Sequence, residues 1–323
     1  MNDDAPSSTD DTAGPADPPS AATRSYGIAP PQYRLPDATR PGQVTLQIAD
    51  LDRSLSYYEN VLGLRVIHRS DERAMLGPEG DDTPLVELHE RPGANPAPRR
   101  GVLGLYHFAI LVPDRQAFGR FVAHLAELGI RPGAADHLVS EALYLHDPDG
   151  LGIEVYADRP RSAWHHQWRE IAMDTTPLDL ADVARAAGGQ RWTGMPAGTV
   201  IGHVHLHVGD LESAAVFYHA ALGLDKTVWS YPGALFMSAG GYHHHLGTNT
   251  WVGADARAPG VGDARLLEWQ LVLPRGSDAE AAARNVAAAG HVVTAAAHGW
   301  TVGDPWGTQL RIRGEDDVAG ESE

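Results

Sequence analysis

Apolar and polar residues alternate in two short segments, VTLQIA at 44–49 and HVHLHV at 203–208, and this period of two predicts β-strands. Each segment leads into a stretch with helical spacing of its apolar residues, at 50–64 and 210–224. An Asp begins and a Gly ends each of these stretches, as is typical of helix N-caps and C-termini. The pattern therefore predicts two strand–helix pairs.

The two pairs are copies of one unit. DLDRSLSYYENVLGL and DLESAAVFYHAALGL align with a constant offset of 160 residues. Two further strand–helix openings lie between and after them, YHFAILVPDR running into QAFGRFVAHLAELGI and EWQLVLPRGS running into DAEAAARNVAAAGH. The sequence thus predicts four units, each a strand, a helix and about three short strands, which begin near Gln43, His107, His203 and Glu268.

Composition narrows the class of protein. The chain has 323 residues, 43% of them hydrophobic, which is enough for two ordinary domains with packed cores. No apolar run reaches the ~18–20 residues of a membrane span. The net charge of −17 argues against nucleic acid and anionic membranes as partners, and the lack of Cys excludes disulfides and zinc–thiolate sites. The Asp-, Ser- and Pro-rich start does not resemble a signal peptide, so we expect a cytoplasmic protein.

These observations predict a division into five segments. We expect a disordered tail at 1–40, a first domain of modules one and two at 41–160, a linker with a short helix at 161–198, a second domain of modules three and four at 199–314, and an acidic tail at 315–323.

The segment HLVSEALYLHDPDGLGIE, residues 137–154, concentrates the candidate chemistry. Tyr144 and Glu154 lie on either side of an Asp-Pro-Asp-Gly turn, so a β-hairpin would point both into one cavity, with His137 nearby. A buried carboxylate such as Glu154 needs a cation. The segment therefore indicates a metal site that handles a hydroxylated substrate.

Four βαβββ units with these openings resemble the vicinal oxygen chelate superfamily, which includes glyoxalase I, bleomycin-resistance proteins and the type I extradiol dioxygenases. The resemblance covers nearly all of residues 42–313. It implies an α+β fold of four βαβββ modules in two domains, whose paired curved sheets form cups. Within the superfamily the chain is most similar to two-domain catechol-2,3-dioxygenase-like proteins.

The resemblance also implies metal-ligand positions on the first and last strands of the modules. The first-strand positions hold Gln43, His107, His203 and Glu268, and the last-strand positions hold Glu87, Glu154, one of His243–His245, and Arg311. Pairing modules one and two would give a Gln/Glu/His/Glu set like that of some glyoxalases, whereas pairing three and four would place the Arg311 cation where a metal should bind. We favour modules two and three, because His107, Glu154 and His203 form a two-His, one-carboxylate triad typical of Fe(II) oxygenases.

An extradiol-dioxygenase signature distinguishes the possible reactions. It is matched in order by His137, Leu143, Tyr144, Asp147, Pro148, Gly150 and Glu154, with Ala135 as a mild departure. The resemblance then implies an extradiol dioxygenase that uses Fe(II), with Mn(II) left open, to convert a catechol and O₂ into a ring-opened semialdehyde. A glyoxalase-like lyase or isomerase and a metal-free binding protein of the bleomycin-resistance type are the alternatives.

The remaining site predictions concern residues around the metal. The resemblance implies that His244 or His245 acts as acid/base, and strand alternation admits only one of them into the cup. Tyr144 would hydrogen-bond a substrate hydroxyl. Substrate contacts are expected from His137, His205 and Trp251. The expected partners are a small aromatic diol and O₂, without nucleic acid or membrane, and homo-oligomerisation stays open.

Overall fold

The structure is a computed structural model that describes residues 26–98, 100–253 and 255–316. The rest of the expected tails, residues 1–25 and 317–323, lies outside the described residues. Residues 26–39, which we expected to belong to the N-terminal tail, are described and pack on the body of the protein. Leu35 is buried, and the Arg34 Nε donates to Asp225 at 2.8 Å.

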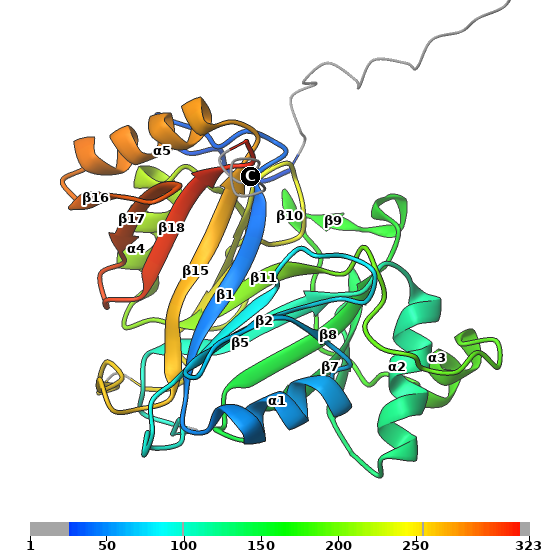
Figure 1. Ribbon diagram of the computed structural model, residues 1–323. Coiled ribbons are helices and arrows are strands. Elements are labelled where there is room, and N and C mark those ends of the chain that lie inside the picture. The colour runs from blue at the N-terminus through cyan, green and yellow to red at the C-terminus, as the bar shows by residue number, and fades with distance from the viewer. Residues whose placement is uncertain (1–25, 99, 254, 317–323) are drawn as a thin grey trace, which may run out of the picture.

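The first half of the chain forms two βαβββ modules followed by a connector (Figure 1). Module one contains β1 (Arg40–Ile48), α1 (Leu51–Asn60), β2 (Arg65–Arg69), β3 (Arg73–Gly77) and β4 (Val86–Glu90). Module two contains β5 (Gly104–Leu111), α2 (Arg115–Glu127), β6 (Gly133–Asp136), β7 (Ser140–His146) and β8 (Gly152–Asp158). The connector contains the 3-10 turn η1 (Arg161–Ala163), β9 (His166–Gln167), β10 (Glu170–Ile171) and α3 (Leu180–Ala186).

The second half repeats the module twice, which confirms the four-module prediction. Module three contains β11 (Val200–His207), α4 (Leu211–Ala214), η2 (Ala215–Ala221), β12 (Asp225–Val228), β13 (Ala234–Ser238) and β14 (Leu246–Asn249). Module four contains β15 (Arg265–Leu273), α5 (Gly276–Ala288), β16 (Val293–Ala296), β17 (Gly299–Gly303) and β18 (Gln309–Gly314).

The two repeated helices differ in one respect that the sequence did not predict. Asp50 caps α1 and Asp210 caps α4 by accepting hydrogen bonds from backbone N–H groups, as expected. The second helix, however, continues from Ala215 as the π-helix η2. The wider turn is seen in the N–H of Leu222, which donates at 2.8 Å to the carbonyl of Phe217, five residues earlier.

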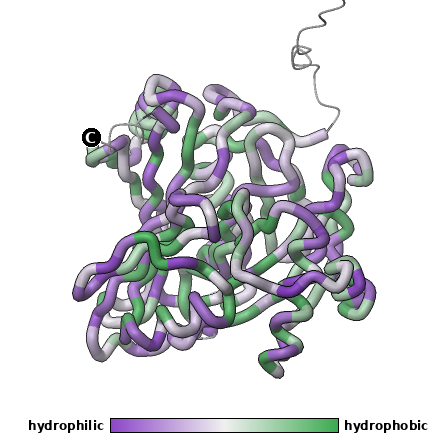
Figure 2. Tube along the Cα trace, turned by 45° about the vertical axis from the view of Figure 1, so that its right-hand side comes forward, coloured by the Kyte–Doolittle hydropathy of each residue, from purple (hydrophilic) through white to green (hydrophobic). Residues whose placement is uncertain are grey.

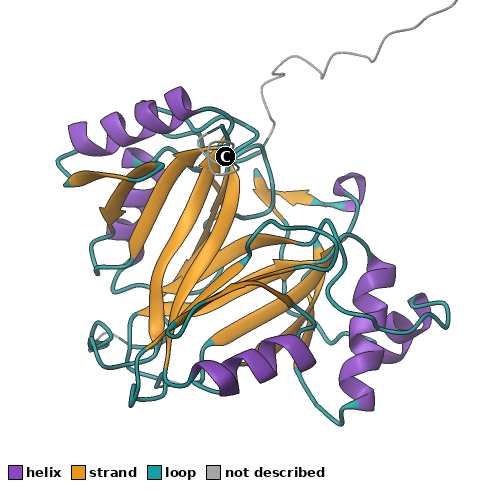
Figure 3. Ribbon diagram, viewed as in Figure 1, coloured by secondary structure: helices purple, strands orange, loops and turns teal. Residues whose placement is uncertain are grey.

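The modules form two mixed eight-stranded sheets, and each sheet takes one module from each half of the chain (Figure 3). The site sheet has the order β12-β13-β14-β11-β5-β8-β7-β6 and joins modules two and three. The second sheet has the order β16-β17-β18-β15-β1-β4-β3-β2 and joins modules one and four. The predicted pairing of modules two and three is therefore confirmed.

First and last strands of a module are neighbours in both sheets. In the site sheet β5 pairs with β8 and β11 pairs with β14, both parallel, while β5 and β11 run antiparallel at the centre. Because ligand positions lie on these first and last strands, the pairing brings candidate ligands from both halves of the chain to one place.

The apolar core lies between the sheets and the helices that cover them. Large side chains such as Phe108, Phe118, Tyr218 and Trp269 are wholly buried in it. Figure 2 shows hydrophobic residues concentrated along the inner strands, while the peripheral loops are mainly hydrophilic. Among the described residues, no helix is long and apolar enough to cross a membrane.

Two equivalent hydrogen bonds attach the helices of one sheet to the turns of the other. The Tyr58 hydroxyl on α1 donates to Asp147 in the β7–β8 turn at 3.3 Å, and the Tyr218 hydroxyl on η2 donates to Asp304 in the β17–β18 turn at 2.9 Å. Asp147 also accepts the N–H groups of Asp149 and Leu151. The Asp of the signature turn thus supports the hairpin and lies outside the cavity described below.

Candidate metal centre and substrate cavity

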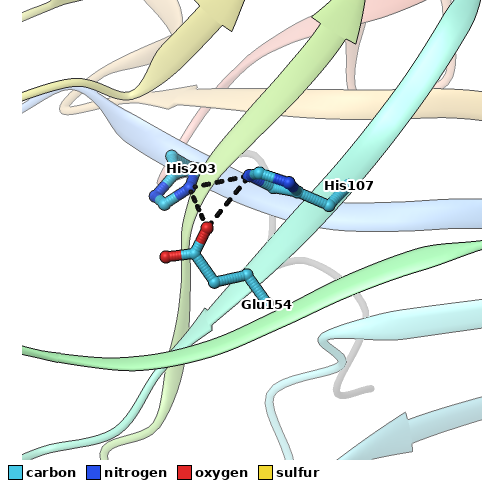
Figure 4. Close-up of side chains that lie close together, drawn as sticks. All are labelled: His107, Glu154 and His203. Atoms are coloured by element: carbon cyan, nitrogen blue, oxygen red, sulfur yellow. Dashed lines mark hydrogen bonds and ion pairs between the residues drawn. The ribbon is translucent and has the colours of Figure 1, made fainter. Parts of the chain in front are cut away.

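Three central strands of the site sheet each contribute one polar side chain to a single buried point. His107 comes from β5, Glu154 from the adjacent β8 and His203 from β11 on the other side of β5 (Figure 4). The Glu154 Oε2 lies 3.0 Å from the His107 Nε2 and 3.3 Å from the His203 Nε2, and the two Nε2 atoms are 3.3 Å apart. Residues far apart in the sequence therefore meet because modules two and three share a sheet.

The spacing of these donor atoms fits a metal ion. Ligand atoms at about 2.1 Å from a metal and at right angles to one another lie about 3.0 Å apart, close to the separations found here. The three residues are the one group of His and acidic side chains with metal-site spacing in the described part of the chain. No Lys or Arg side chain is hydrogen-bonded or ion-paired to Glu154 among the interactions of the described residues, so its charge is left for a cation.

Burial sets the protonation of the group. All three residues are at most 5% exposed. Burial lowers the pKa of His203 to about 4, more than the neighbouring Glu154 raises it, so its imidazole is neutral at pH 7 and can offer a lone pair. Burial alone would raise the pKa of Glu154, but its contacts with His203 and His107 hold it well below its usual range. A buried anion with two imidazoles is a set of ligands suited to a divalent transition metal.

A cavity of about 200 Å³ lies beside the triad, with His107 and Glu154 in contact with it and His203 behind its lining residues. His107 and Glu154 form part of its wall, together with the predicted catalytic residues Tyr144 and His244 and the predicted substrate contacts His137, His205 and Trp251. Other lining residues were not predicted from the sequence, namely Tyr106, Ser140, Met173, Asp174, Thr175, Tyr231 and Phe236. Met173, Asp174 and Thr175 belong to the connector, where no periodic pattern indicated a role.

Tyr144 and Glu154 point into the cavity as predicted, because they are directly paired across the β7–β8 hairpin. The Tyr144 hydroxyl lies 2.5 Å from the His137 Nε2, and the His137 Nδ1 lies 2.8 Å from the carbonyl of Asp174. A carbonyl only accepts, so the His137 Nδ1 carries a proton, and in the neutral ring Nε2 accepts from the Tyr144 hydroxyl. The Tyr144 oxygen therefore keeps its lone pairs for a hydroxyl group in the cavity.

His244 and His245, left as alternatives by the sequence, have different surroundings. His244 lines the cavity and packs on His203 with ring centroids 4.1 Å apart. His245 is not among the lining residues. Its ring stacks on Tyr242, and its Nδ1 accepts the N–H of Ala239 at 3.2 Å. Burial lowers the pKa of His245 to about 3, which makes it a neutral packing residue.

His205 and Trp251 form an aromatic wall with Tyr106. Tyr106 makes edge contacts with both rings, at centroid separations of 5.1 and 5.7 Å. The His205 Nε2 accepts the Asn249 amide N–H at 3.0 Å, and burial holds the pKa of His205 well below its usual value. His205 is thus a neutral wall residue whose orientation is fixed by Asn249.

The glyoxalase-like ligand set is not assembled. Gln43 and Glu87 lie on β1 and β4 of the second sheet, whereas His107 and Glu154 lie on the site sheet. The Gln43 amide donates to Glu87 at 2.8 Å, and Glu87 also contacts the His89 Nε2 at 2.6 Å. That alternative fails because it requires modules one and two to share a sheet.

A larger cleft of about 750 Å³ lies elsewhere, where the ends of β5 and β15 approach the β17–β18 turn. Its wall contains none of the three candidate ligands. Size alone would select this cleft, but the convergence of buried donors selects the smaller cavity above His107 and Glu154 as the candidate site.

The fold and the central triad agree with comparisons to known proteins. The profile of the Glyoxalase/Bleomycin resistance protein/Dioxygenase superfamily matches residues 40–155 and 200–312, well over half of the chain. The protein therefore belongs to this superfamily.

Among its relatives is the catechol-2,3-dioxygenase of Bacillus subtilis (strain 168), which is 46% identical over 271 residues that cover 83% of this chain and 94% of the relative. The biphenyl-2,3-diol 1,2-dioxygenase 3 of Rhodococcus globerulus is 28% identical over 158 residues, 46% of this chain and 83% of the relative. Glyoxalase I from Zea mays has a similar fold, with a TM-score of 0.50, 18% identity, and coverage of 87% of this chain and 94% of its own.

Proposed function

We propose that the protein is an Fe(II)-dependent extradiol dioxygenase, which opens the ring of a catechol or substituted catechol and places both atoms of O₂ in a semialdehyde product. The observation that carries the proposal is the convergence of His107, Glu154 and His203 on one buried point beside a cavity. The catechol-2,3-dioxygenase relative, with 46% identity over most of both chains, supports the same reaction.

The metal would be held by the Nε2 atoms of His107 and His203 and by a carboxylate oxygen of Glu154. Two imidazoles and one carboxylate occupy one face of a coordination sphere and leave the other positions for ligands from the cavity. When bound, iron would lower the pKa of a diol hydroxyl and carry electrons between the diol and O₂. Mn(II) accepts the same ligands, and Fe(II) is our choice because this triad is typical of Fe(II) oxygenases.

The residues of the cavity wall would orient the substrate. Tyr144 would accept a hydrogen bond from a substrate hydroxyl, since its own proton is donated to His137. Burial, with the nearby Glu154, raises the pKa of Tyr144 well above its usual value, so the phenol stays protonated. His205 and Trp251 would contact the ring, and a cavity of about 200 Å³ suits one aromatic ring better than a large ligand.

His244 would supply acid/base chemistry at the reacting oxygen atoms. It lines the cavity beside His203, and burial holds the pKa of His244 well below its usual value, so its ring is neutral and its unprotonated nitrogen carries a lone pair. His245 does not line the cavity and has no such role in this proposal.

The proposal is tested by reconstitution. The full chain would be loaded anaerobically with Fe(II), Mn(II) or Zn(II), mixed with catechol in an oxygen electrode, and the yellow ring-opened product followed by absorbance. We expect one O₂ consumed per product formed with Fe(II), and none with redox-inert Zn(II). Stoichiometric Fe(II) binding without O₂ uptake on catechol, 3-methylcatechol or 2,3-dihydroxybiphenyl would overturn the assignment.

A further inference from the structure

A chain of buried side chains extends from the cavity to the end of β8. His244 lies in the segment between β13 and β14, and its Nδ1 is 2.8 Å from the Nδ1 of His243. The His243 Nε2 is 3.0 Å from the Asp158 Oδ1. The His243 side chain is 0% exposed and that of Asp158 is 26% exposed. The chain therefore connects a cavity residue, through a wholly buried imidazole, to a carboxylate at the protein surface.

The chemistry of these groups fixes the direction of the hydrogen bonds. A carboxylate only accepts, so the His243 Nε2 carries a proton and donates it to Asp158. The Tyr242 hydroxyl donates to the same carboxylate oxygen at 3.2 Å, which agrees with an acceptor at this point. In a neutral imidazole the second nitrogen is an acceptor. With the His243 ring neutral, its Nδ1 accepts from the His244 Nδ1, which then carries the proton of that ring.

We infer that Asp158 and His243 are positioning residues, which fix the tautomer of His244 so that its Nε2 presents a lone pair to the cavity. Because Nδ1 is engaged with His243, Nε2 is the nitrogen left for a ligand in the cavity. The pair acts on His244 as a carboxylate acts on an imidazole in many active sites, where the partner of one ring nitrogen decides the state of the other.

The tautomer of His244 decides which proton transfers its ring can make. An imidazole with a free Nε2 lone pair can accept a proton from a diol hydroxyl or from a late intermediate, whereas the opposite tautomer could only donate. The role in turnover rests on the proposed function, but the tautomer itself depends only on the residues of this chain.

The packing around His243 gives the pair little freedom. Its ring contacts Tyr242 at a centroid separation of 4.1 Å and Trp164 at 5.3 Å. The Tyr242 hydroxyl also shares a hydrogen bond with the Tyr156 hydroxyl at 2.7 Å. These aromatic neighbours prevent the His243 ring from turning, so the two hydrogen bonds keep their geometry.

The tautomer can be read directly by NMR. The full-length protein would be labelled with ¹⁵N in its histidine rings, and two-bond ¹⁵N–¹H spectra recorded without metal and with Zn(II). The His244 signals are assigned by their loss in His244→Gln. We expect a protonated Nδ1 and a bare Nε2 in the wild type. A protonated Nε2 on His244 would overturn the inference whatever the activity of the enzyme.

Three variants separate a positioning role from general damage. His243→Phe keeps the ring but removes the acceptor, so the His244 proton should move to Nε2, and Asp158→Asn should shift the population in the same direction. Tyr242→Phe removes another hydroxyl of the network and should leave the tautomer unchanged. If neither of the first two variants alters the His244 spectrum, Asp158 and His243 do not set its tautomer.

Activity provides the second measurement. In Asp158→Asn we expect kcat to fall by about 10- to 100-fold, with iron content and KM near the wild-type values, because the metal ligands and the cavity wall are intact. An unchanged kcat together with an altered tautomer would refute the catalytic consequence of the inference. Failure of the wild type to cleave any catechol would refute the proposed function and leave the NMR result to judge the tautomer.

Discussion

The site sheet and the second sheet share one architecture but differ in what occupies the ligand positions. In the site sheet, His107, Glu154 and His203 surround one point. Within residues 26–98, 100–253 and 255–316, Glu154 has two imidazoles as ion-pair partners and no Lys or Arg. In the second sheet, Glu268 is paired with Arg311 at 2.6 Å and makes a second contact with it at 3.1 Å. The fold provides the positions, and the absence of an internal cation beside Glu154 makes one set of positions a metal site.

The internal repeat allows the two sheets to be compared position by position. Gln43 on β1 stands 160 residues before His203 on β11, and Arg311 on β18 takes the place that Glu154 has on β8. At the ligand positions of the second sheet, Glu87 contacts Gln43 and His89, and Glu268 is paired with Arg311. Both carboxylates therefore have protein partners and do not need a metal. In this protein, a metal site therefore depends on a carboxylate that no Lys or Arg neutralises, as well as on ligands at the first- and last-strand positions.

The largest effect on iron binding is expected when the ligand position on the first strand is changed to Ala, with the equivalent position of the second sheet as the control. His203→Ala removes a ligand, so we expect iron affinity to fall by at least about 100-fold, since even residues that only support ligands cost 10- to 100-fold. Gln43→Ala changes the equivalent position of the second sheet and should retain full iron content. Iron measured per chain after desalting checks both, and retention of iron by His203→Ala would show that β11 contributes no ligand.

The two turn carboxylates should differ in how they link stability to pH. Burial, reinforced by the charge of Asp149, raises the pKa of Asp147 to about 7, although its backbone hydrogen bonds oppose the shift. An acid whose pKa is raised by folding stabilises the fold fully below its unfolded pKa, near 4, and loses that contribution as the pH rises to about 7. Burial also raises the pKa of Asp304. In that turn, however, the position equivalent to Asp149 holds the uncharged Trp306, so no neighbouring carboxylate adds to the shift.

Asp147→Asn stays neutral at every pH, so it should reduce the loss of unfolding free energy between pH 5 and 8 by on the order of 1–3 kcal/mol. Asp304→Asn should reduce this pH-dependent loss of unfolding free energy by a smaller amount. Urea unfolding at several pH values measures both. A full wild-type pH dependence in Asp147→Asn would mean that another group titrates in this range.

The ion pair of the second sheet should affect stability without affecting the metal. Arg311→Ala leaves Glu268 partly buried without its cation, and we expect the unfolding free energy to fall by about 1–3 kcal/mol while iron content and activity per folded molecule are unchanged. The exposed pair of Arg275 with Asp278 is the control, because Arg275→Ala should cost less than about 1 kcal/mol. Loss of bound iron in Arg311→Ala would show that the two sheets are not independent.

Much of the fold was predictable because its signals are local. The Asp caps, the alternating strands and the offset of 160 residues indicate four modules without any knowledge of contacts. The hairpin that pairs Tyr144 with Glu154 was also predictable, because its turn lies between them. The π-helix η2 was not, since its sequence carries the same apolar spacing as α1.

The site was only partly predictable. His107 and Glu154 were marked by their strand positions, but the choice among His243, His244 and His245 depends on how the segment after Gly240 and Gly241 enters β14. Both glycines have positive φ values, 61° and 67°, and the resulting turn buries His243 against Asp158 while His244 lines the cavity. The connector residues of the cavity wall had no sequence signal.

The sequence by itself determined which residues could be ligands, because residue type and strand position are written along the chain. Only the tertiary structure decided which of them meet. His107 and His203 are 96 residues apart, yet their Nε2 atoms are 3.3 Å apart, because β5 and β11 pair at the centre of the site sheet. The physical reason is that local patterns fix each strand and its faces, whereas the partner of a strand is set by the burial of the whole sheet.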